Sequence, residues 1–342
     1  MNREDISKVI ERKGENKIMD IVNEIIEKLG KASKIAVVGH IMPDGDCISS
    51  VLSLSIGLEK LGKFAMPMID YNVPWFYREF EGTEKIKDFE GGKKFLEESE
   101  LLVILDSSSP DRIGRVKEYM ERKFTIVMDH HATNSKFGDL NWVDSNYSSV
   151  AEMVFILNRM MNVNYDPLLA TLNLMGMATD TGFFKYSNVS ADLFRKVADL
   201  IELGADLNFI ARTILENKKV EQLRLFSHVL NQMKFRANNR LVYSIVRFED
   251  FERYSCTEED SSGFVNELRS IRGVEVAILF VEYPKGRIHA SMRSKSYYDL
   301  TKVASEFNGG GHPRAAGATF DDENMEQVVK KVVGRIERDL TN

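Results

Sequence analysis

Short apolar runs alternate with amphipathic segments through the first third of the chain. The runs are rich in Val, Ile, Leu, Phe and Met, and they occupy residues 35–39, 64–69, 101–105 and 124–128. Amphipathic segments such as 48–61 and 112–122 lie between them. This alternation predicts an α/β fold with a parallel sheet, because neighbouring parallel strands need a crossover segment to join them.

The pattern changes twice in the remainder of the chain. Helical periodicity prevails from 147 to about 235, with Gly204 as a helix stop, and strand-like runs return at 241–247, 274–283 and 287–294. The last two runs are joined by a predicted hairpin at 284–286, and helices are expected at 299–307 and from about 322. We therefore expect four regions: a helical extension (1–32), a parallel-sheet domain (33–190), a helical connector (191–235) and a smaller α/β domain (236–342).

Composition excludes several classes of protein. The 342 residues are 43% apolar and 29% charged, which suits a globular protein with two cores, and the net charge of −6 disfavours binding to long DNA or RNA. The N-terminus lacks the apolar core of a signal peptide, and no stretch reaches the roughly 18 apolar residues of a membrane span. The two cysteines form no zinc or disulfide pattern. We expect a cytoplasmic protein without a membrane or long-duplex partner.

Carboxylates and imidazoles gather at the ends of apolar runs. Four segments of the chain supply them: His40, Asp44 and Asp46; Asp106; Asp129, His130 and His131; and Asp180. Ligands of open α/β sheets bind outside the carboxyl ends of the strands, so we expect all four groups at strand ends, converging on one point. Taken singly, each aspartate could instead cap a helix or a turn.

This set of side chains favours divalent metal ions. Carboxylate oxygens with a minority of imidazole nitrogens and no thiolate suit manganese better than structural zinc, with magnesium or cobalt as alternatives. His40, Asp44 and Asp106 could hold one ion, while Asp46, Asp106, His130 and Asp180 hold a second. Four carboxylates would then balance two divalent cations, and a bridging hydroxide could attack phosphorus.

The order His-x-x-x-Asp-x-Asp, Asp106, Asp129-His130-His131 and Asp180 resembles the four motifs of the DHH phosphoesterase superfamily. The resemblance implies the same six metal ligands. It also implies that Asp129 orients the site and that His131 contacts the scissile phosphate or assists the leaving group. Every ligand position is filled, which argues for a working enzyme.

A second resemblance lies near the C-terminus. The segments 289–294 (HASMRS) and 309–317 (GGGHPRAAG) resemble the substrate-binding domain attached to DHH cores in oligoribonucleases of the NrnA type. Such enzymes have their active site in a cleft between the two domains. The glycines would let a backbone loop offer its amides to an anion, although a bare flexible loop is the alternative. The candidate substrate-binding residues are Arg112, Asn134, Ser291, Arg293, Gly309, Gly310, Gly311, His312 and Arg314.

The resemblance implies a manganese-dependent phosphodiesterase that hydrolyses short oligonucleotides, such as nanoRNA or the dinucleotide pApA, to nucleoside 5′-monophosphates. Removal of the 3′-phosphate from adenosine 3′,5′-bisphosphate (pAp) is a further expected activity. A cyclic di-AMP phosphodiesterase is the first alternative, and a nucleotide sensor without turnover is the second. The sequence leaves the preferred substrate, the polarity of cleavage and the formation of a homodimer open.

Overall fold

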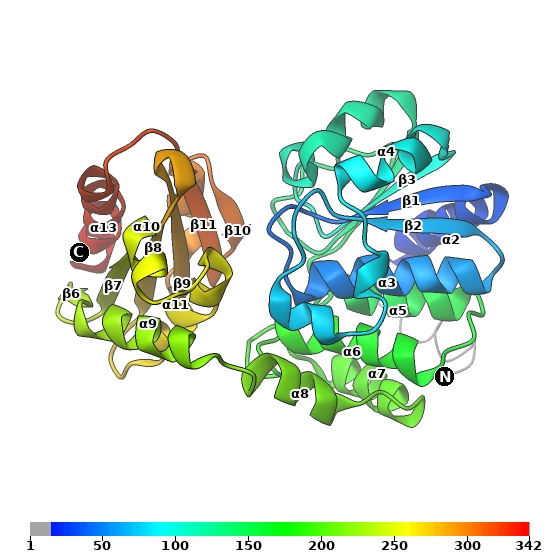
Figure 1. Ribbon diagram of the computed structural model, residues 1–342. Coiled ribbons are helices and arrows are strands. Elements are labelled where there is room, and N and C mark those ends of the chain that lie inside the picture. The colour runs from blue at the N-terminus through cyan, green and yellow to red at the C-terminus, as the bar shows by residue number, and fades with distance from the viewer. Residues whose placement is uncertain (1–14, 342) are drawn as a thin grey trace. The chain divides into compact units, whose positions relative to one another are not determined.

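The computed structural model describes residues 15–341, in two compact units that divide between Asn217 and Lys218 (Figure 1). The division falls inside the predicted connector, 191–235. Of the predicted N-terminal extension, α2 (Glu15–Lys31) is described, and residues 1–14 lie outside the described part of the chain. Within residues 15–341, no helix combines the length and the apolar character that a membrane crossing requires.

The first unit is built on a five-stranded parallel sheet in the order β2-β1-β3-β4-β5, which confirms the predicted parallel sheet. Its strands are β1 (Lys34–Val38), β2 (Phe64–Met68), β3 (Leu101–Leu105), β4 (Phe124–Asp129) and β5 (Leu140–Val143). From β1 the chain adds β2 on one side and β3 on the other. This reversal creates a switch point at the carboxyl ends of β1 and β3, where ligands of open α/β sheets bind.

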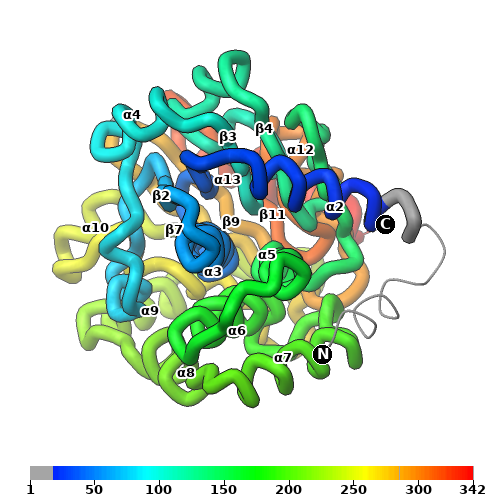
Figure 2. Tube along the Cα trace, turned by 90° about the vertical axis from the view of Figure 1, so that its right-hand side faces the viewer, coloured from blue at the N-terminus to red at the C-terminus, as the bar shows by residue number. Residues whose placement is uncertain are grey.

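Helical elements cover both faces of this sheet. The face that contains Ala36, Ile104 and Val127 packs against α4 (Phe89–Glu98) and η3 (Pro110–Arg122). The opposite face packs against α2, α3 (Gly45–Lys60) and α5 (Val150–Met160). A further layer, formed by α6 (Pro167–Asp180), α7 (Ala191–Glu202) and α8 (Leu207–Leu215), shares a core with the far side of α3. In Figure 2, α3 and α5 lie side by side with α6 beneath them.

Helix α3 is buried on nearly every side, because it lies between the sheet and α6. Its short side chains allow the close packing: a Cβ at Gly57 would lie 2.6 Å from the Asn158 amide, and Ser49 donates a hydrogen bond to Leu172 O at 2.5 Å. A helix enclosed in this way has a fixed axis. The residues at its N-terminus are therefore held in place by the core.

The crossover segment at 112–122 differs from a regular helix. It belongs to η3, a 3-10 helix interrupted at Gly114, whose backbone has φ 60° and ψ −141°. A Cβ at this position would lie 2.6 Å from Asp70 Oδ2, so glycine is required on grounds of both space and backbone conformation. Other short elements of the first unit are η1 (Trp75–Glu79) and η2 (Thr83–Lys85).

The second unit contains a six-stranded mixed sheet in the order β10-β11-β9-β8-β7-β6. Its strands are β6 (Lys234–Arg236), β7 (Leu241–Val246), β8 (Val276–Tyr283), β9 (Arg287–Ser294), β10 (Gly310–His312) and β11 (Ala315–Phe320). The β7–β8 pair is parallel and the other pairs are antiparallel. The predicted hairpin at 284–286 is confirmed as η5 (Pro284–Gly286), which joins β8 to β9.

One face of the second sheet packs against α12 (Leu300–Glu306) and α13 (Met325–Thr341). On the other face, α9 (Val220–Asn231), α10 (Phe248–Arg253) and α11 (Phe264–Ser270) pack over β7 and β8, near η4 (Glu258–Ser261). Along β9 the residues alternate between buried and partly exposed. The partly exposed positions of β9 point to the same side as Ala277 and Leu279 of β8, which pair with Arg293 and Ser291.

Candidate active site

The first cluster of functional side chains forms where β1 passes into α3. Asp44 is the N-cap of α3, and its Oδ1 accepts a hydrogen bond from Cys47 N at 3.0 Å. The turn is tight, because His40 N–H donates to Cys47 Sγ at 3.2 Å and a Cβ at Gly39 would overlap that sulfur. This geometry aims the His40 imidazole and the Asp44 carboxylate into the same space, with His40 Nε2 3.8 Å from Asp44 Oδ1.

Asp46, in the first turn of α3, is held by the start of α5. Its Oδ2 accepts a hydrogen bond from Val150 N at 2.7 Å, its Oδ1 accepts one from Ala151 N at 2.8 Å, and Ser50 Oγ donates to Oδ1 at 3.2 Å. A helix N-terminus offers unpaired N–H groups and a partial positive charge, both of which suit a carboxylate. Asp46 is therefore fixed in orientation although its carboxylate is buried.

Asp106 follows β3 and lies at the centre of the site. Its Oδ2 is 3.4 Å from His40 Nε2, and its Oδ1 is 3.7 Å from His130 Nε2. Oδ1 is buried and has no hydrogen-bond partner among residues 15–341. Burial raises the pKa of Asp106 well above its ordinary value, and the charges of Asp46 and Asp44 raise it further. The charged form of the Asp106 carboxyl group therefore lacks the hydrogen-bond donors that a buried anion needs.

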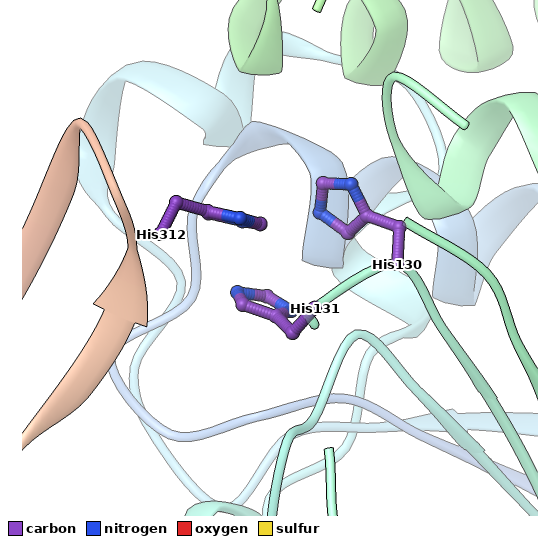
Figure 3. A group of neighbouring side chains, drawn as sticks. All are labelled: His130, His131 and His312. Atoms are coloured by element: carbon purple, nitrogen blue, oxygen red, sulfur yellow. The ribbon is translucent and has the colours of Figure 1, made fainter. Parts of the chain in front are cut away.

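The end of β4 supplies two histidines and their supporting carboxylate. Figure 3 shows His130 and His131 leaving the end of β4 with their rings at a steep angle, and the ring centroids are 4.9 Å apart. His131 Nδ1 lies 2.7 Å from Asp129 Oδ1. Burial raises the pKa of Asp129, but the hydrogen bonds from His131 and Asn134 outweigh it, so the net pKa is lowered. Asp129 therefore holds the His131 ring through a charged carboxylate.

Asp180 completes the cluster, from an unexpected element. The expectation that every candidate ligand follows a strand is wrong for this residue, because Asp180 is the last residue of α6. The apolar run before it is a helix that packs against α3, and the C-terminus of this helix reaches the same place as the strand ends. His130 Nε2 lies 3.5 Å from Asp180 Oδ2 and 3.9 Å from Asp46 Oδ2.

The structure thus brings the six predicted ligands together in two groups. In each group the potential ligand atoms lie within 4.8 Å of one another: His40, Asp44 and Asp106 form one, and Asp46, His130 and Asp180 form the other. Asp106 contacts His130 as well as His40, and so it lies between the groups. Divalent cations fit this arrangement, because they would neutralise the crowded carboxylates and give the unpartnered Asp106 Oδ1 a partner.

Two other predicted residues of the first unit lie beside the cluster. Arg112 Nη2 is 3.0 Å from His40 Nδ1, and its backbone carbonyl accepts a hydrogen bond from Ile41 N at 2.7 Å. Asn134 uses its amide nitrogen to donate to Ser107 O at 2.9 Å and to Asp129 Oδ2 at 2.6 Å. The contacts of Asn134 therefore support Asp129.

In the second unit, the predicted substrate-binding residues lie mainly in two rows across the sheet. Arg293 pairs with Ala315, which pairs with His312; Ser291 pairs with Gly317, which pairs with Gly310. Residues paired directly across strands project from the same face of the sheet, so these side chains share one surface. Ala315 and Gly317, which lie between the polar residues, have the smallest side chains, so they leave room for a ligand at the centre of that surface.

The glycine run does not form the expected loop. Gly310 and Gly311 belong to the edge strand β10, which pairs with β11. A Cβ at Gly309 would overlap Gly317 O, and Gly311 has φ 136°, so both positions require glycine for pairing. A Cβ at Gly310 would meet no atom within 4 Å. Arg314 donates to Tyr298 O at 2.7 Å and thereby holds the turn before α12.

Comparison with known proteins agrees with this geometry. The DHH family, N-terminal domain, matches residues 34–177, and the DHHA1 domain matches residues 238–338. A curated relative from Thermus thermophilus is 32% identical over 94% of both chains. The chain belongs to the DHH family.

The DHH-family relatives share most of their length with this chain. The Thermus thermophilus protein is named bifunctional oligoribonuclease and PAP phosphatase NrnA, and a Bacillus subtilis protein of the same name is 24% identical over 87% of this chain and 92% of its own. An exopolyphosphatase-related protein from Bacteroides fragilis superposes with a TM-score of 0.85 at 27% identity, covering 95% of this chain and 98% of that one. This DHH-family protein is accordingly a hydrolase.

Sequence reasoning missed one part of this DHH-family site, the segment from Tyr147 to Ala151. Ser149 followed by Glu152 three residues later is a typical helix start, and Ser149 is indeed the N-cap of α5. This signal places the helix but does not show that its first amides bind Asp46, more than a hundred residues earlier in the chain.

Proposed function

We propose that this protein is a manganese-dependent phosphodiesterase that hydrolyses pApA and other short oligonucleotides to nucleoside 5′-monophosphates and removes the 3′-phosphate from pAp. The observation that carries the proposal is the pair of ligand groups on either side of Asp106. The names of the relatives from Thermus thermophilus and Bacillus subtilis support the substrate class.

The side chains of the first unit are proposed to have two roles, metal binding and contact with the reacting phosphate. His40, Asp44 and Asp106 are proposed to hold one divalent ion, and Asp46, Asp106, His130 and Asp180 the other. Two such ions would activate a water molecule and stabilise charge on the attacking and leaving oxygens. Asp129 holds His131 through Nδ1, which directs the opposite ring nitrogen toward the phosphate or the leaving oxygen.

The second unit is proposed to bind the remainder of the substrate. Arg293 offers a planar guanidinium, which suits a phosphate, while Ser291 and His312 add hydrogen-bonding groups on the same face. Arg112 is proposed to bind phosphate from the first unit, since its side chain lies next to His40. The cleft between domains, a homodimer and a cytoplasmic location stay predictions.

The test is hydrolysis of five compounds with Mn²⁺, with products followed by chromatography. The compounds are pApA, cyclic di-AMP, pAp, pyrophosphate and a 24-nucleotide RNA. We expect rapid release of AMP from pApA and pAp, with little product from the other three. Comparable turnover of cyclic di-AMP would favour the cyclic-dinucleotide alternative, and no turnover of any compound would favour a sensor.

Two variants make the assay specific for the metal groups. Asp106→Asn removes the shared carboxylate charge and should abolish turnover. Asp111→Asn is the matched control, because the Asp111 side chain is 84% exposed and forms an ion pair with Lys117 on the surface. Loss of activity in both variants would argue against the assigned role of Asp106.

A further inference from the structure

A single turn of the chain contacts two of the proposed ligands and is connected to a third. The turn comprises residues 147–151, at the start of α5, and we call it the 147–151 turn. Tyr147 O lies 3.4 Å from His130 Nδ1, and the amides of Val150 and Ala151 donate to Asp46. Nδ1 of His130 faces a carbonyl oxygen, which favours the tautomer that donates from Nδ1 and directs the Nε2 lone pair toward the cluster.

The third contact runs through Asn188. Its amide nitrogen donates to Ser148 O at 3.0 Å and to Asp180 O at 3.2 Å, which ties the turn to the end of α6. The turn therefore contacts Asp46 and His130 directly and is tied through Asn188 to the backbone of Asp180. These three residues form one of the two ligand groups. Asp44 Oδ1 accepts its hydrogen bond from Cys47 N, and His40 Nδ1 lies 2.8 Å from Ile41 O and 3.0 Å from Arg112 Nη2, so the contacts of both residues lie outside this turn.

A buried ion pair anchors the turn. Glu152 Oε2 accepts hydrogen bonds from Ser148 N at 2.7 Å and Ser148 Oγ at 2.8 Å, while Glu152 Oε1 accepts one from Lys196 Nζ at 2.9 Å. Lys196 lies on α7 and is 1% exposed, and Glu152 is 4% exposed. Burial lowers the pKa of Lys196, but Glu152 and Asp192 outweigh burial and raise it, so the ammonium group is charged.

Stability alone does not account for this pair. Removing two charges from water is unfavourable, and apolar residues of similar volume often replace such pairs without loss of stability. The Glu152 carboxylate has a second role here, since it fixes both the amide and the hydroxyl of Ser148. Lys196 places the opposite charge directly beside this buried carboxylate.

We propose that the Lys196–Glu152 pair is a positioning device for one metal ion, the one assigned to Asp46, His130 and Asp180. It acts through the 147–151 turn and leaves the ion at His40 and Asp44 unaffected. The inference rests on the metal-dependent function proposed above. Lys196 and Glu152 are positioning residues that touch neither metal nor substrate.

The experiment is a Mn²⁺ titration of the full-length protein, followed by the paramagnetic resonance signal of unbound Mn²⁺. Residues that orient metal ligands typically contribute about 10–100-fold in affinity. Lys196→Met should therefore weaken one of two binding steps by roughly 10-fold or more, with the other step unchanged. Lys196→Arg keeps the charge and should restore most of the affinity.

Two further variants distinguish positioning from general loss of stability. Lys219→Met is the matched control, because Lys219 pairs with the buried Asp260 in the second unit; it should leave both binding steps unchanged. Asn188→Ala changes an exposed residue, so the protein should fold normally while the same single step weakens. This variant keeps the inference testable if Lys196→Met fails to fold.

The possible results separate the two proposals. If the wild-type protein binds no Mn²⁺, the proposed function fails. If the wild-type protein binds two ions and both Lys196→Met and Asn188→Ala bind them with unchanged affinity, the positioning role fails and the function stands. Equal weakening of both steps would also overturn the inference, because the 147–151 turn contacts only one ligand group.

Discussion

At the scale of single residues, Asp106 combines three unusual properties. It is buried, its backbone adopts φ 58°, and one carboxylate oxygen has no hydrogen-bond partner among the described residues. A left-handed backbone is tolerated by aspartate but still costs energy, and strain of this kind gathers at functional sites. These properties are what the proposed role of Asp106 as a shared metal ligand requires, and they imply that its buried carboxylate destabilises the metal-free protein.

The first prediction concerns Asp106→Asn in the presence of a chelator. The folded-state pKa of Asp106 is raised, so its unfavourable effect on stability grows as the pH rises through that pKa. The metal-free variant should therefore melt a few degrees above the metal-free wild type at pH 8, and the difference should shrink toward pH 5. About 1 kcal/mol corresponds to roughly 2–4 °C in a domain of 150–250 residues.

Thermal melts at both pH values, with and without Mn²⁺, check this prediction. Mn²⁺ should raise the melting temperature of the wild type and have little effect on the variant. If the metal-free variant melts below the metal-free wild type at pH 8, the Asp106 carboxylate does not destabilise the metal-free protein.

The second prediction concerns Asp129→Asn, which keeps the shape of the side chain and removes its charge. His131 would lose the carboxylate that holds Nδ1, so kcat should fall roughly 10–100-fold while Mn²⁺ binding is retained. Steady-state kinetics with pApA and the Mn²⁺ titration together measure this split. A parallel loss of metal affinity would instead make Asp129 a ligand.

At the scale of secondary-structure elements, the site depends on the approach of α3 to α6. Asp46 begins α3 and Asp180 ends α6. Gly45 lies directly against Thr179, and a Cβ there would overlap the threonine hydroxyl. The close contact of these two helix ends sets the spacing between two proposed ligands.

The third prediction follows from this contact. Gly45→Ala should force the helix ends apart, destabilise the protein by roughly 1–3 kcal/mol and weaken Mn²⁺ binding. Gly334→Ala is the control: Gly334 lies within α13, a Cβ there meets no atom within 4 Å, and alanine should add roughly 0.5–1 kcal/mol of stability. Denaturant unfolding measures the stability of both variants. Unchanged stability in Gly45→Ala would show that the contact between the two helix ends does not exclude a larger side chain.

Sequence patterns predicted the strands that are rich in large apolar residues and missed the strands that are short or rich in glycine and alanine. The apolar runs at β1, β3 and β4 are continuous and buried on both faces, which makes them easy to find. Strands β5, β6, β10 and β11 were missed. The first three have only three or four residues, and in β10 and β11 glycine and alanine replace the usual strand-forming residues. Asp180 was grouped with the strand-end residues although the segment before it shows helical periodicity, because a short apolar run before an acid looks the same in a strand and in a buried helix.

The candidate ligands and the supporting role of Asp129 were predicted from residue types, order and resemblance, whereas the supports around the 147–151 turn were not. His40, Asp44 and Asp46 stand together in the sequence, so their convergence needs only one turn. Lys196 and Glu152 are 44 residues apart and meet because α7 returns along the start of α5. Contacts of this kind depend on packing between helices, which local patterns do not contain.

At the scale of the whole molecule, the two units carry different chemistry. The first unit gathers the carboxylates and imidazoles that favour metal ions, and the second presents arginine, serine and glycine on the surface formed by β9, β10 and β11. Such a division suits an enzyme that performs hydrolysis with one unit and selects its substrate with the other.

The fourth prediction tests that division. Arg293→Gln should raise KM for pApA by roughly 10-fold or more, because a hydrogen bond to a charged group contributes about 1.5–3 kcal/mol, and it should leave the Mn²⁺ titration unchanged. Arg287→Gln is the control on the same strand, since Arg287 already pairs with Asp321. An equal rise of KM in both variants would indicate a general charge effect.

The central claim is that two metal ions share Asp106. Anomalous diffraction at the manganese edge, from crystals of the protein grown with Mn²⁺, measures this directly. We predict two peaks about 3.5–4 Å apart, one beside His40 and Asp44 and the other beside Asp46, His130 and Asp180, with the Asp106 carboxylate between them. A single peak, or two peaks that Asp106 does not bridge, would contradict the account.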